Sequence, residues 1–247
     1  GMIGPLVLGQ SSYCRNSPKG EWNYTINPKL TDKSIDWSRW LGKTGKRPFN
    51  ANHFFRWRKY NPYCCGILGD LLAHKIHPLM IASGNPEFPE RVACLGTKEI
   101  TKDRDVPDNT QVLATFPSGY TLMVVGSTVN QQGLPEMLRG HHGTLYFGGD
   151  KVDLKPETPF GDEIDPESFS DLKPSGADFF AEHADWFKVI RNGGETKGNI
   201  NLSMRAQVVI SLAEMSERMS LTLLFDEKSR KITTGTGQEV QPLNYPA

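Results

Sequence analysis

The alternation of apolar and polar side chains between Thr110 and Val129 is the feature that most constrains the fold. Two runs, TQVLATF and YTLMVVGSTV, are separated by PSG, which is a turn signal, so this segment predicts a β-hairpin. In the first run Val112, Ala114 and Phe116 alternate with the other positions, whereas TLMVVG in the second run is apolar on both sides. A sheet built on this hairpin needs cover on both faces. We therefore expect helices on one face and an oligomer interface on the other.

The remaining periodicity adds further strands and places helices around them. Strand-like runs are found at 3–14, 91–96, 143–149, 151–156 and 221–226. Helical spacing of apolar residues predicts helices at 66–83, 179–191 and 203–219. Antiparallel hairpins with helices before and after them predict an α+β fold with a large, mostly antiparallel sheet. Residues 15–63 show no clear period, which is typical of a functional loop or an extended arm.

The charge balance and the cysteine pattern exclude several classes of function. The 247 residues include 28 Lys and Arg and 28 Asp and Glu, and no long block of one sign occurs, which argues against nucleic acid and anionic membranes as partners. No apolar run approaches the roughly 20 residues that span a bilayer. The four cysteines have no CxxC spacing, so we expect free, buried thiols rather than a zinc or redox site. The cellular compartment stays open.

The stretch GILGDLLAHKIHPLM sets three ionisable side chains into an otherwise apolar run. At about 100° per residue of helix, Asp70, His74 and His77 fall within about 60° of one another, and aliphatic side chains take the opposite side. This predicts a helix with one chemical face and one packing face. The pattern alone leaves three interpretations open: a polar face satisfied by neighbouring loops, a metal site, and a catalytic face.

The sequence lacks the motifs of several common enzyme classes. No GxGxxG follows a predicted strand, no GxxxxGK[ST] occurs, and neither GxSxG nor HExxH is present. We therefore expect that this chain does not bind a dinucleotide through a Rossmann turn of its own.

Six segments, taken in order, resemble the C-terminal domain of the Gfo/Idh/MocA oxidoreductases, a family named for glucose-fructose oxidoreductase and inositol dehydrogenase. The segments are IGPLVLGQSSYCRN, DWSRWLGKTGKRPFN, FFRWRKY, GILGDLLAHKIHPL, RGHHGTLYFGG and LAEMS. The resemblance covers nearly the whole chain, and its most specific part is Asp-x-x-x-His after a glycine-containing turn. It implies that residues 1–247 are a single substrate-binding and oligomerisation domain of a larger, two-domain oxidoreductase. NAD or NADP would be bound mainly by an N-terminal Rossmann domain, which the sequence given does not contain.

The resemblance also implies roles for individual residues. His74 would act as general acid/base on the substrate hydroxyl that becomes a carbonyl, a task that suits an imidazole with an unperturbed pKa of about 6.5. Asp70 would orient that ring or bind a neighbouring hydroxyl. Tyr13, Arg15 and Asn16 would border the substrate.

Three positions depart from the family pattern. His77 stands where many members have an acid, and we expect it to border the substrate in that acid's place. Cys14 stands where relatives often have histidine, and Trp186 stands where asparagine is frequent.

The basic-aromatic segment FFRWRKY allows three interpretations. It could form a wall of a sugar pocket, pack as a loop whose arginines bond to backbone carbonyls, or imitate a nucleic-acid surface. Under the first interpretation, Arg56, Lys59 and Tyr60 contact the substrate.

These observations lead to one expected function and three alternatives. We expect the substrate-binding half of an NAD(P)-dependent oxidoreductase that acts on a sugar or polyol by hydride transfer, and we expect little turnover from this chain alone. Its partners would be an N-terminal nucleotide-binding domain and further copies of itself, with neither nucleic acid nor a membrane involved. The alternatives are an NAD-dependent, redox-neutral glycosidase of the same superfamily, a metal-dependent hydrolase using Asp70, His74 and His77, and a non-enzymatic oligomerisation scaffold.

Overall fold

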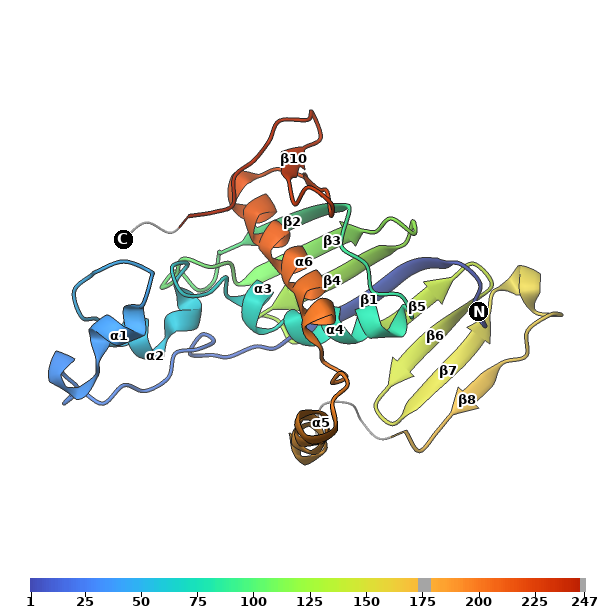
Figure 1. The fold of residues 1–247 in the computed structure, drawn as a ribbon, viewed down its shortest axis with the longest axis horizontal. Coiled ribbons are helices and arrows are strands. Elements are labelled where there is room, and N and C mark those ends of the chain that lie inside the picture. The colour runs from blue at the N-terminus through green and yellow to red at the C-terminus, as the bar shows by residue number, and fades with distance from the viewer. Residues whose placement is uncertain (173–178, 245–247) are drawn as a thin grey trace.

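One large sheet forms the frame of the protein, whose computed structural model describes residues 1–172 and 179–244. Within these residues ten strands pair in the order β10-β9-β2-β3-β4-β1-β5-β6-β7-β8 (Figure 1). β1 and β4 run parallel, and the other neighbouring strands run antiparallel. The strands are β1 (Leu6–Cys14), β2 (Arg91–Thr97), β3 (Asn109–Thr115), β4 (Thr121–Ser127), β5 (Glu136–Gly140), β6 (Gly143–Gly148), β7 (Lys151–Pro156), β8 (Glu167–Phe169), β9 (Leu223–Phe225) and β10 (Ile232–Thr234). The predicted α+β class and the mostly antiparallel sheet are confirmed.

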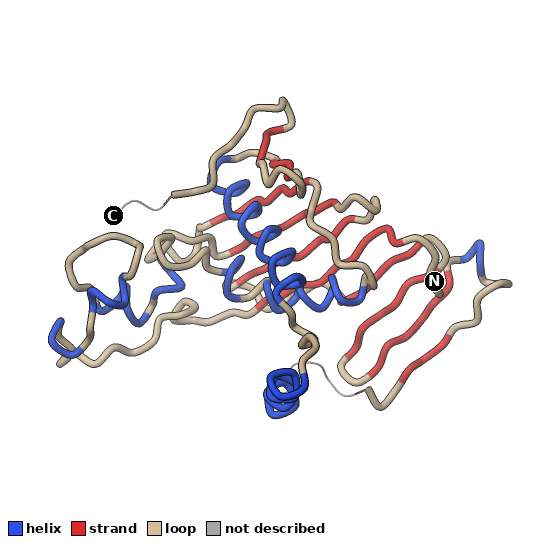
Figure 2. Tube along the Cα trace, viewed as in Figure 1, coloured by secondary structure: helices blue, strands red, loops and turns tan. Residues whose placement is uncertain are grey.

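Three helices cover one face of the sheet, as the sequence predicts (Figures 1 and 2). They are α3 (Ile67–Asp70), α4 (Ala73–Ala82) and α6 (Ile200–Met219). Their apolar sides meet the inward-facing residues of the central strands, and the shared core includes Leu72, Ile76, Val112, Val124 and Val209. Burial of this apolar surface is the main force that holds the layers together.

The single helix predicted around Asp70 is in fact two helices, α3 and α4. Between them the backbone N–H of Leu72 donates to the carbonyl of Ile67, five residues back, and the N–H of His74 donates to Leu71, three residues back. This interruption of the regular ladder allows two consecutive side chains, Leu71 and Leu72, to be buried together. Asp70 and His74 therefore belong to different helices rather than to one helical face.

The face of the sheet opposite these helices carries an apolar strip. In β3, Val112 and Ala114 are buried in the core, as their alternation predicts, whereas Leu113 between them is 46% exposed. Leu113 pairs with Met123 on β4, and Leu95 on the neighbouring β2 is 74% exposed. The expectation that this face joins copies of the protein stays a prediction.

Residues 15–63, here called the arm, leave the sheet after β1 and extend beyond it at one end of the long axis (Figure 1). The arm contains η1 (Asp32–Ser34), α1 (Trp37–Leu41), α2 (Ala51–Phe55) and η2 (Trp57–Lys59). Trp37 stacks on Trp40 with 4.9 Å between ring centroids, and the rings of Phe49, Phe54 and Tyr63 pack against this pair. The arm is therefore a lobe with a small aromatic core of its own.

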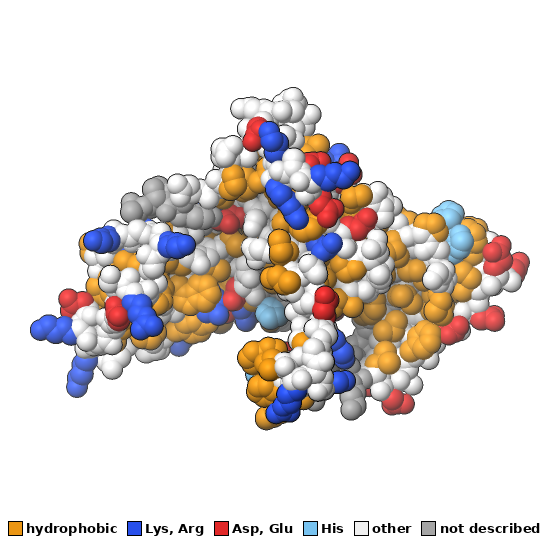
Figure 3. Space-filling model, viewed as in Figure 1, with side chains coloured by type: hydrophobic (Ala, Val, Ile, Leu, Met, Phe, Trp, Pro, Cys, Tyr) orange, Lys and Arg blue, Asp and Glu red, His pale blue; other side chains and the backbone are white. Residues whose placement is uncertain are grey.

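The opposite end of the molecule is formed by β7, η3 (Thr158–Phe160) and β8. Figure 3 shows Lys and Arg side chains gathered at the arm and Asp and Glu side chains along this other end.

α5 (Phe179–Asn192) stands below the sheet in the view of Figure 1. None of the described helices is long and apolar enough to cross a membrane. All four cysteines are free, as expected, but only Cys94 is buried, and Cys14, Cys64 and Cys65 are half-buried.

Candidate functional site

Two glycines let α3 pack closely, one against a central strand and one against the loop between β2 and β3. A Cβ on Gly126 of β4 would lie 2.2 Å from Ile67 of α3, so any larger residue would push the helix away. Gly66, directly before α3, has a φ of 60°, and a Cβ there would lie 2.6 Å from Val106. The glycine-containing turn before Asp70 thus fixes where α3 begins.

The carboxylate of Asp70 binds the arm rather than His74. Its Oδ2 accepts a hydrogen bond from the indole N–H of Trp22 at 3.2 Å, and its Oδ1 accepts one from the guanidinium of Arg58. Arg58 in turn lies over the ring of Trp57, 4.2 Å from its centroid. Within the described residues no hydrogen bond joins Asp70 to His74. The geometry therefore gives no support to Asp70 as the group that orients the His74 ring: Asp70 anchors the arm to α3, and its expected contact with a substrate hydroxyl stays a prediction.

The imidazole of His74 is accessible to a substrate. Its side chain is exposed, and its ring lies beside that of Tyr13 on β1, with 6.2 Å between centroids and a 48° tilt between the planes. Pro78 lies inside α4 and lacks the N–H that would donate to the carbonyl of His74. β1 and α4 thus bring together two residues, Tyr13 and His74, that the sequence analysis assigned to one site.

His77 faces α6 rather than His74. Its Nε2 lies 3.5 Å from the hydroxyl oxygen of Ser203, and burial lowers the pKa of its imidazole, which favours the neutral ring. Among the residues that the structure describes, Asp70, His74 and His77 form no group of three side chains that could hold a metal ion. The geometry therefore gives no support to the metal-dependent hydrolase.

Lys59 does not border a substrate, contrary to the expectation for this residue. It is 1% exposed, and its ammonium donates to the carboxylate of Asp103 at 2.6 Å and to the side chain of Asn23 at 2.7 Å. Asp103 also accepts from the buried guanidinium of Arg104 at 3.1 Å. Partial burial raises the pKa of Asp103, but hydrogen bonds from Lys59, Asn23 and Arg104 outweigh it and hold that pKa well below the usual range. This cluster fastens the arm to the loop between β2 and β3.

Arg56 and Tyr60 also contact the arm itself. The guanidinium of Arg56 donates to the carbonyl of Tyr24 at 2.7 and 3.0 Å and to the side chain of Asn52 at 2.9 Å. The ring of Tyr60 stacks on His53 with 4.2 Å between centroids, and burial raises the pKa of its phenol. Of the three interpretations of FFRWRKY, the structure favours the packed loop, in which an arginine bonds to a backbone carbonyl.

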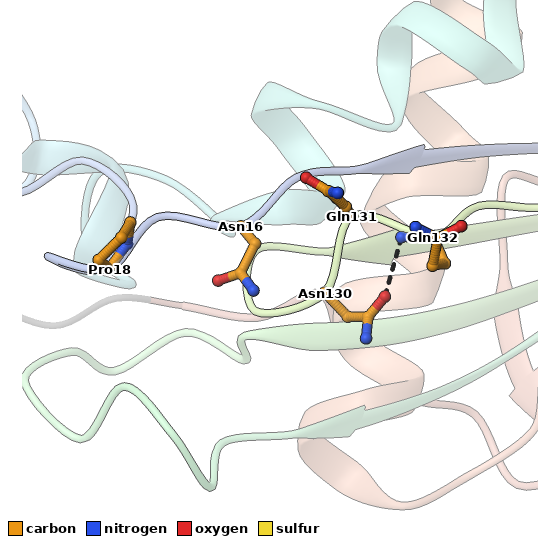
Figure 4. A pocket seen from close by; sticks show the side chains of 5 residues that line it. All are labelled: Asn16, Pro18, Asn130, Gln131 and Gln132. Atoms are coloured by element: carbon orange, nitrogen blue, oxygen red, sulfur yellow. Dashed lines mark hydrogen bonds between the residues drawn. The ribbon is translucent and has the colours of Figure 1, made fainter.

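An open pocket lies where the two parallel strands end. β1 and β4 finish at the same edge of the sheet, and the loops that follow them pair through Asn16 and Val129. The pocket has a volume of about 630 Å³ and is lined by Asn16, Pro18, Asn130, Gln131 and Gln132 (Figure 4). Four of these five side chains are amides, which both donate and accept hydrogen bonds. The sequence analysis included Asn16 but missed the other three, for which the run NQQG directly after a strand was the available signal.

Residues 13–16, here called the strip, connect His74 with the amide pocket along the chain: Tyr13 lies beside His74, and Asn16 lines the pocket. The guanidinium of Arg15 lies 5.5 Å from the centroid of the Tyr13 ring, and its Nε lies 3.4 Å from the carboxylate of Glu21. Asn16 follows Arg15 directly and lines the pocket. His74 itself does not line the pocket, so the imidazole and the amides stand at the two ends of this strip.

Comparison with sequence families identifies the fold. The family model for the Gfo/Idh/MocA oxidoreductases, described as the C-terminal alpha/beta domain of an oxidoreductase family, matches residues 18–241. This chain belongs to the Gfo/Idh/MocA oxidoreductase family. Comparison with curated proteins gives no match.

Solved structures of similar fold are also oxidoreductases. Aldose-aldose oxidoreductase from Caulobacter crescentus, complexed with glycerol, is 16% identical with a TM-score of 0.61, over 91% of this chain and 57% of that one. Levoglucosan dehydrogenase, complexed with NADH and levoglucosan, is 16% identical with a TM-score of 0.57, over 89% of this chain and 58% of that one. An oxidoreductase from Agrobacterium radiobacter, in complex with NAD⁺, L-tartaric acid and magnesium, is 14% identical with a TM-score of 0.59, over 91% of this chain and 58% of that one. At these identities the likeness establishes the fold alone, and the Gfo/Idh/MocA chain described here spans less than two thirds of each of these proteins.

Proposed function

We propose that this chain is the substrate-binding half of an NAD(P)-dependent oxidoreductase that acts on a sugar or polyol, with His74 as its general acid/base. The observation that carries the proposal is the exposed imidazole of His74 beside Tyr13, at one end of a strip that leads to an amide-lined pocket. Membership of an oxidoreductase family supports the reaction class. Glycerol and levoglucosan in the complexes of two proteins with the same fold support the substrate class.

The side chains of the amide pocket suit a substrate with several hydroxyl groups. The amides of Asn16, Asn130 and Gln131 each offer a donor and an acceptor, which is what successive hydroxyls require. His74 takes the proton from the hydroxyl that becomes a carbonyl, and returns it in the reverse direction. Tyr13 limits the orientations that the imidazole can adopt. His77, half-buried against α6, supports the helix that carries His74.

The residues of this chain do not fit NAD(P) by themselves. The glycine-rich turn that holds a pyrophosphate is absent from the sequence. Within the described residues the parallel strands β1 and β4 are separated by several helices and two antiparallel strands, rather than joined by one crossover helix. In this proposal a Rossmann domain of the same protein, outside this chain, binds the nucleotide, and the apolar strip around Leu113 joins further copies. The greater length of the solved relatives supports the first point.

The test is reduction of NAD or NADP across a panel of sugars and polyols, using this chain joined to its native nucleotide-binding domain. His74→Ala is expected to lower kcat by about 100-fold or more, because the proton then has no positioned acceptor. His141→Ala removes another exposed histidine, in the turn between β5 and β6, and serves as the matched control with an unchanged rate. Full turnover in His74→Ala would contradict the proposed role.

Product analysis on the same samples separates the remaining alternatives. Net formation of the reduced nucleotide indicates a dehydrogenase, whereas glycosidic cleavage without net reduction indicates the redox-neutral glycosidase. A scaffold would show no turnover, and its sugar binding would not change in His74→Ala.

A further inference from the structure

The charges of this chain balance overall but are separated in space. The arm holds eleven Lys and Arg against three Asp and Glu, whereas residues 150–172, here called the acidic edge, hold two Lys and eight Asp and Glu. The arm and the acidic edge lie at opposite ends of the long axis (Figures 1 and 3). Neither surface can therefore neutralise the other within one copy.

The cations of the arm are available to a partner. No ion pair among the described residues involves five exposed cations of the arm, namely Lys29, Lys33, Arg39, Lys43 and Lys46. The lobe that carries them is held by the stacked rings of Trp37 and Trp40 and by the cluster around Lys59. Because this backbone is already ordered, binding through these side chains requires less loss of conformational freedom.

The acidic edge is equally accessible. Five of its carboxylates are exposed and take part in no ion pair within the described part of the chain, namely Asp162, Glu163, Asp165, Glu167 and Asp171. Asp153, by contrast, pairs with Lys151 at 2.8 Å. β8 is the outermost strand of the sheet on this side, and the carboxylates on it and beside it discourage pairing with arbitrary strands. They leave the edge attractive to a cationic surface.

We propose that the arm of one copy docks on the acidic edge of a second copy of this chain. A two-fold axis perpendicular to the long axis places each arm beside the other copy's edge, which gives two identical contacts in a closed dimer. The second copy is the partner because it offers an excess of anions similar in size to the excess of cations on the arm. The contact uses neither His74 nor the amide pocket, so its failure would leave the proposed function standing.

The test is the dimer dissociation constant of Leu95→Glu/Leu113→Glu, a variant that lacks the sheet contact proposed above, measured by sedimentation equilibrium. It is expected to rise at least about tenfold between about 20 and 300 mM NaCl, because the Debye length falls from roughly 20 Å to roughly 6 Å. Lys43→Glu/Lys46→Glu on the arm and Asp162→Lys/Glu163→Lys on the edge should each weaken the dimer about tenfold at low salt. A chain with all four reversals should regain affinity, because the two surfaces are complementary again.

Matched controls keep the result specific. Lys197→Glu/Lys228→Glu makes the same change of net charge as the arm variant, at exposed positions outside both surfaces, and should leave the dimer unchanged. Three results would overturn the proposal. They are a monomer at low salt, a dimer whose dissociation constant does not change with salt, and a variant with all four reversals that binds no more tightly than the variants with two. Heparin binding that depends on Lys43 and Lys46, with an unaffected dimer, would also overturn it and assign the arm to a polyanion. If the unsubstituted chain is a dimer while Leu95→Glu/Leu113→Glu is a monomer at low salt, the sheet face alone joins the copies and the arm contact is overturned.

Discussion

The centre of the sheet and the arm are held together by different forces. Around Leu72 and Val112, apolar side chains from helices and strands exclude water, and the same period repeats along each element. At the base of the arm, Lys59 and Arg104 are buried and share the carboxylate of Asp103. The difference shows that periodicity in a sequence predicts where apolar side chains are buried but does not predict where charged side chains are buried.

The largest expected effect lies in the centre of the sheet. Leu72→Ala should lower the free energy of unfolding by about 3 kcal/mol, because Leu72 is fully buried between α4 and the sheet and its removal leaves a cavity. Urea unfolding followed by far-UV circular dichroism measures it. The control, Leu95→Ala on the apolar strip of the sheet, should cost less than about 0.5 kcal/mol at concentrations where the chain is monomeric. Equal losses in the two variants at those concentrations would contradict the exposure of Leu95 within one copy.

The next effect should be confined to the arm. Asp103→Asn leaves the buried cations Lys59 and Arg104 without a carboxylate, which should cost about 2 kcal/mol of local stability. Hydrogen exchange should then speed up across the arm and leave the amides of β3 and β4 protected. Lys59→Met is the matched variant and should cost less, because the half-exposed Asp103 can be hydrated. A uniform loss of protection would show that the arm and the sheet unfold as one unit.

Acid should open the arm before it unfolds the sheet. The pKa of Asp103 is lowered in the folded state, so its ion pairs contribute stability above the unfolded value of about 3.9, and that contribution falls as the pH drops below about 4. The fluorescence of Trp22 and the other arm tryptophans, followed from pH 7 to pH 2, should change before the far-UV signal of the sheet. In Asp103→Asn the early change should shrink. Coincident transitions in the wild type would refute this order.

The smallest effect concerns the aromatic core of the arm. Trp37→Leu removes the stacked contact with Trp40 and should cost about 1 kcal/mol, detectable as faster exchange in α1 and α2. Phe180→Leu replaces a ring that is 88% exposed and should change nothing measurable. No difference between the two variants would mean that the arm owes its order to the Asp103 cluster alone.

The sequence predicted the parts of this fold that repeat. The burial of Val112 and Ala114 with Leu113 facing out follows directly from their alternation. The break between α3 and α4 did not follow, because the adjacent leucines at the junction also fit one continuous helix. For the same reason the prediction that Asp70 and His74 share one face of a single helix was wrong, because Asp70 lies at the end of α3 and His74 lies in α4.

The candidate site could be predicted only in part from the sequence, because its contacts join residues far apart in the chain. Tyr13 and His74 were proposed together from a family resemblance, and the structure brings their rings side by side. The hydrogen bond from Trp22 to Asp70 spans 48 positions and depends on how the arm folds back, which no local pattern reveals. Lys59 was assigned to a pocket wall from its place in the basic-aromatic segment FFRWRKY, and its burial depends on Asp103, 44 positions away.

The position of β1 has a consequence for how the protein is assembled during synthesis. β1 is the only strand, among those described, that joins β10-β9-β2-β3-β4 to β5-β6-β7-β8. Its neighbours β4 and β5 begin at Thr121 and Glu136, so β1 leaves the ribosome more than 100 residues before either partner strand exists. Residues 6–14 therefore stay unpaired during that interval, and the two halves of the sheet join only after β4 and β5 have been made.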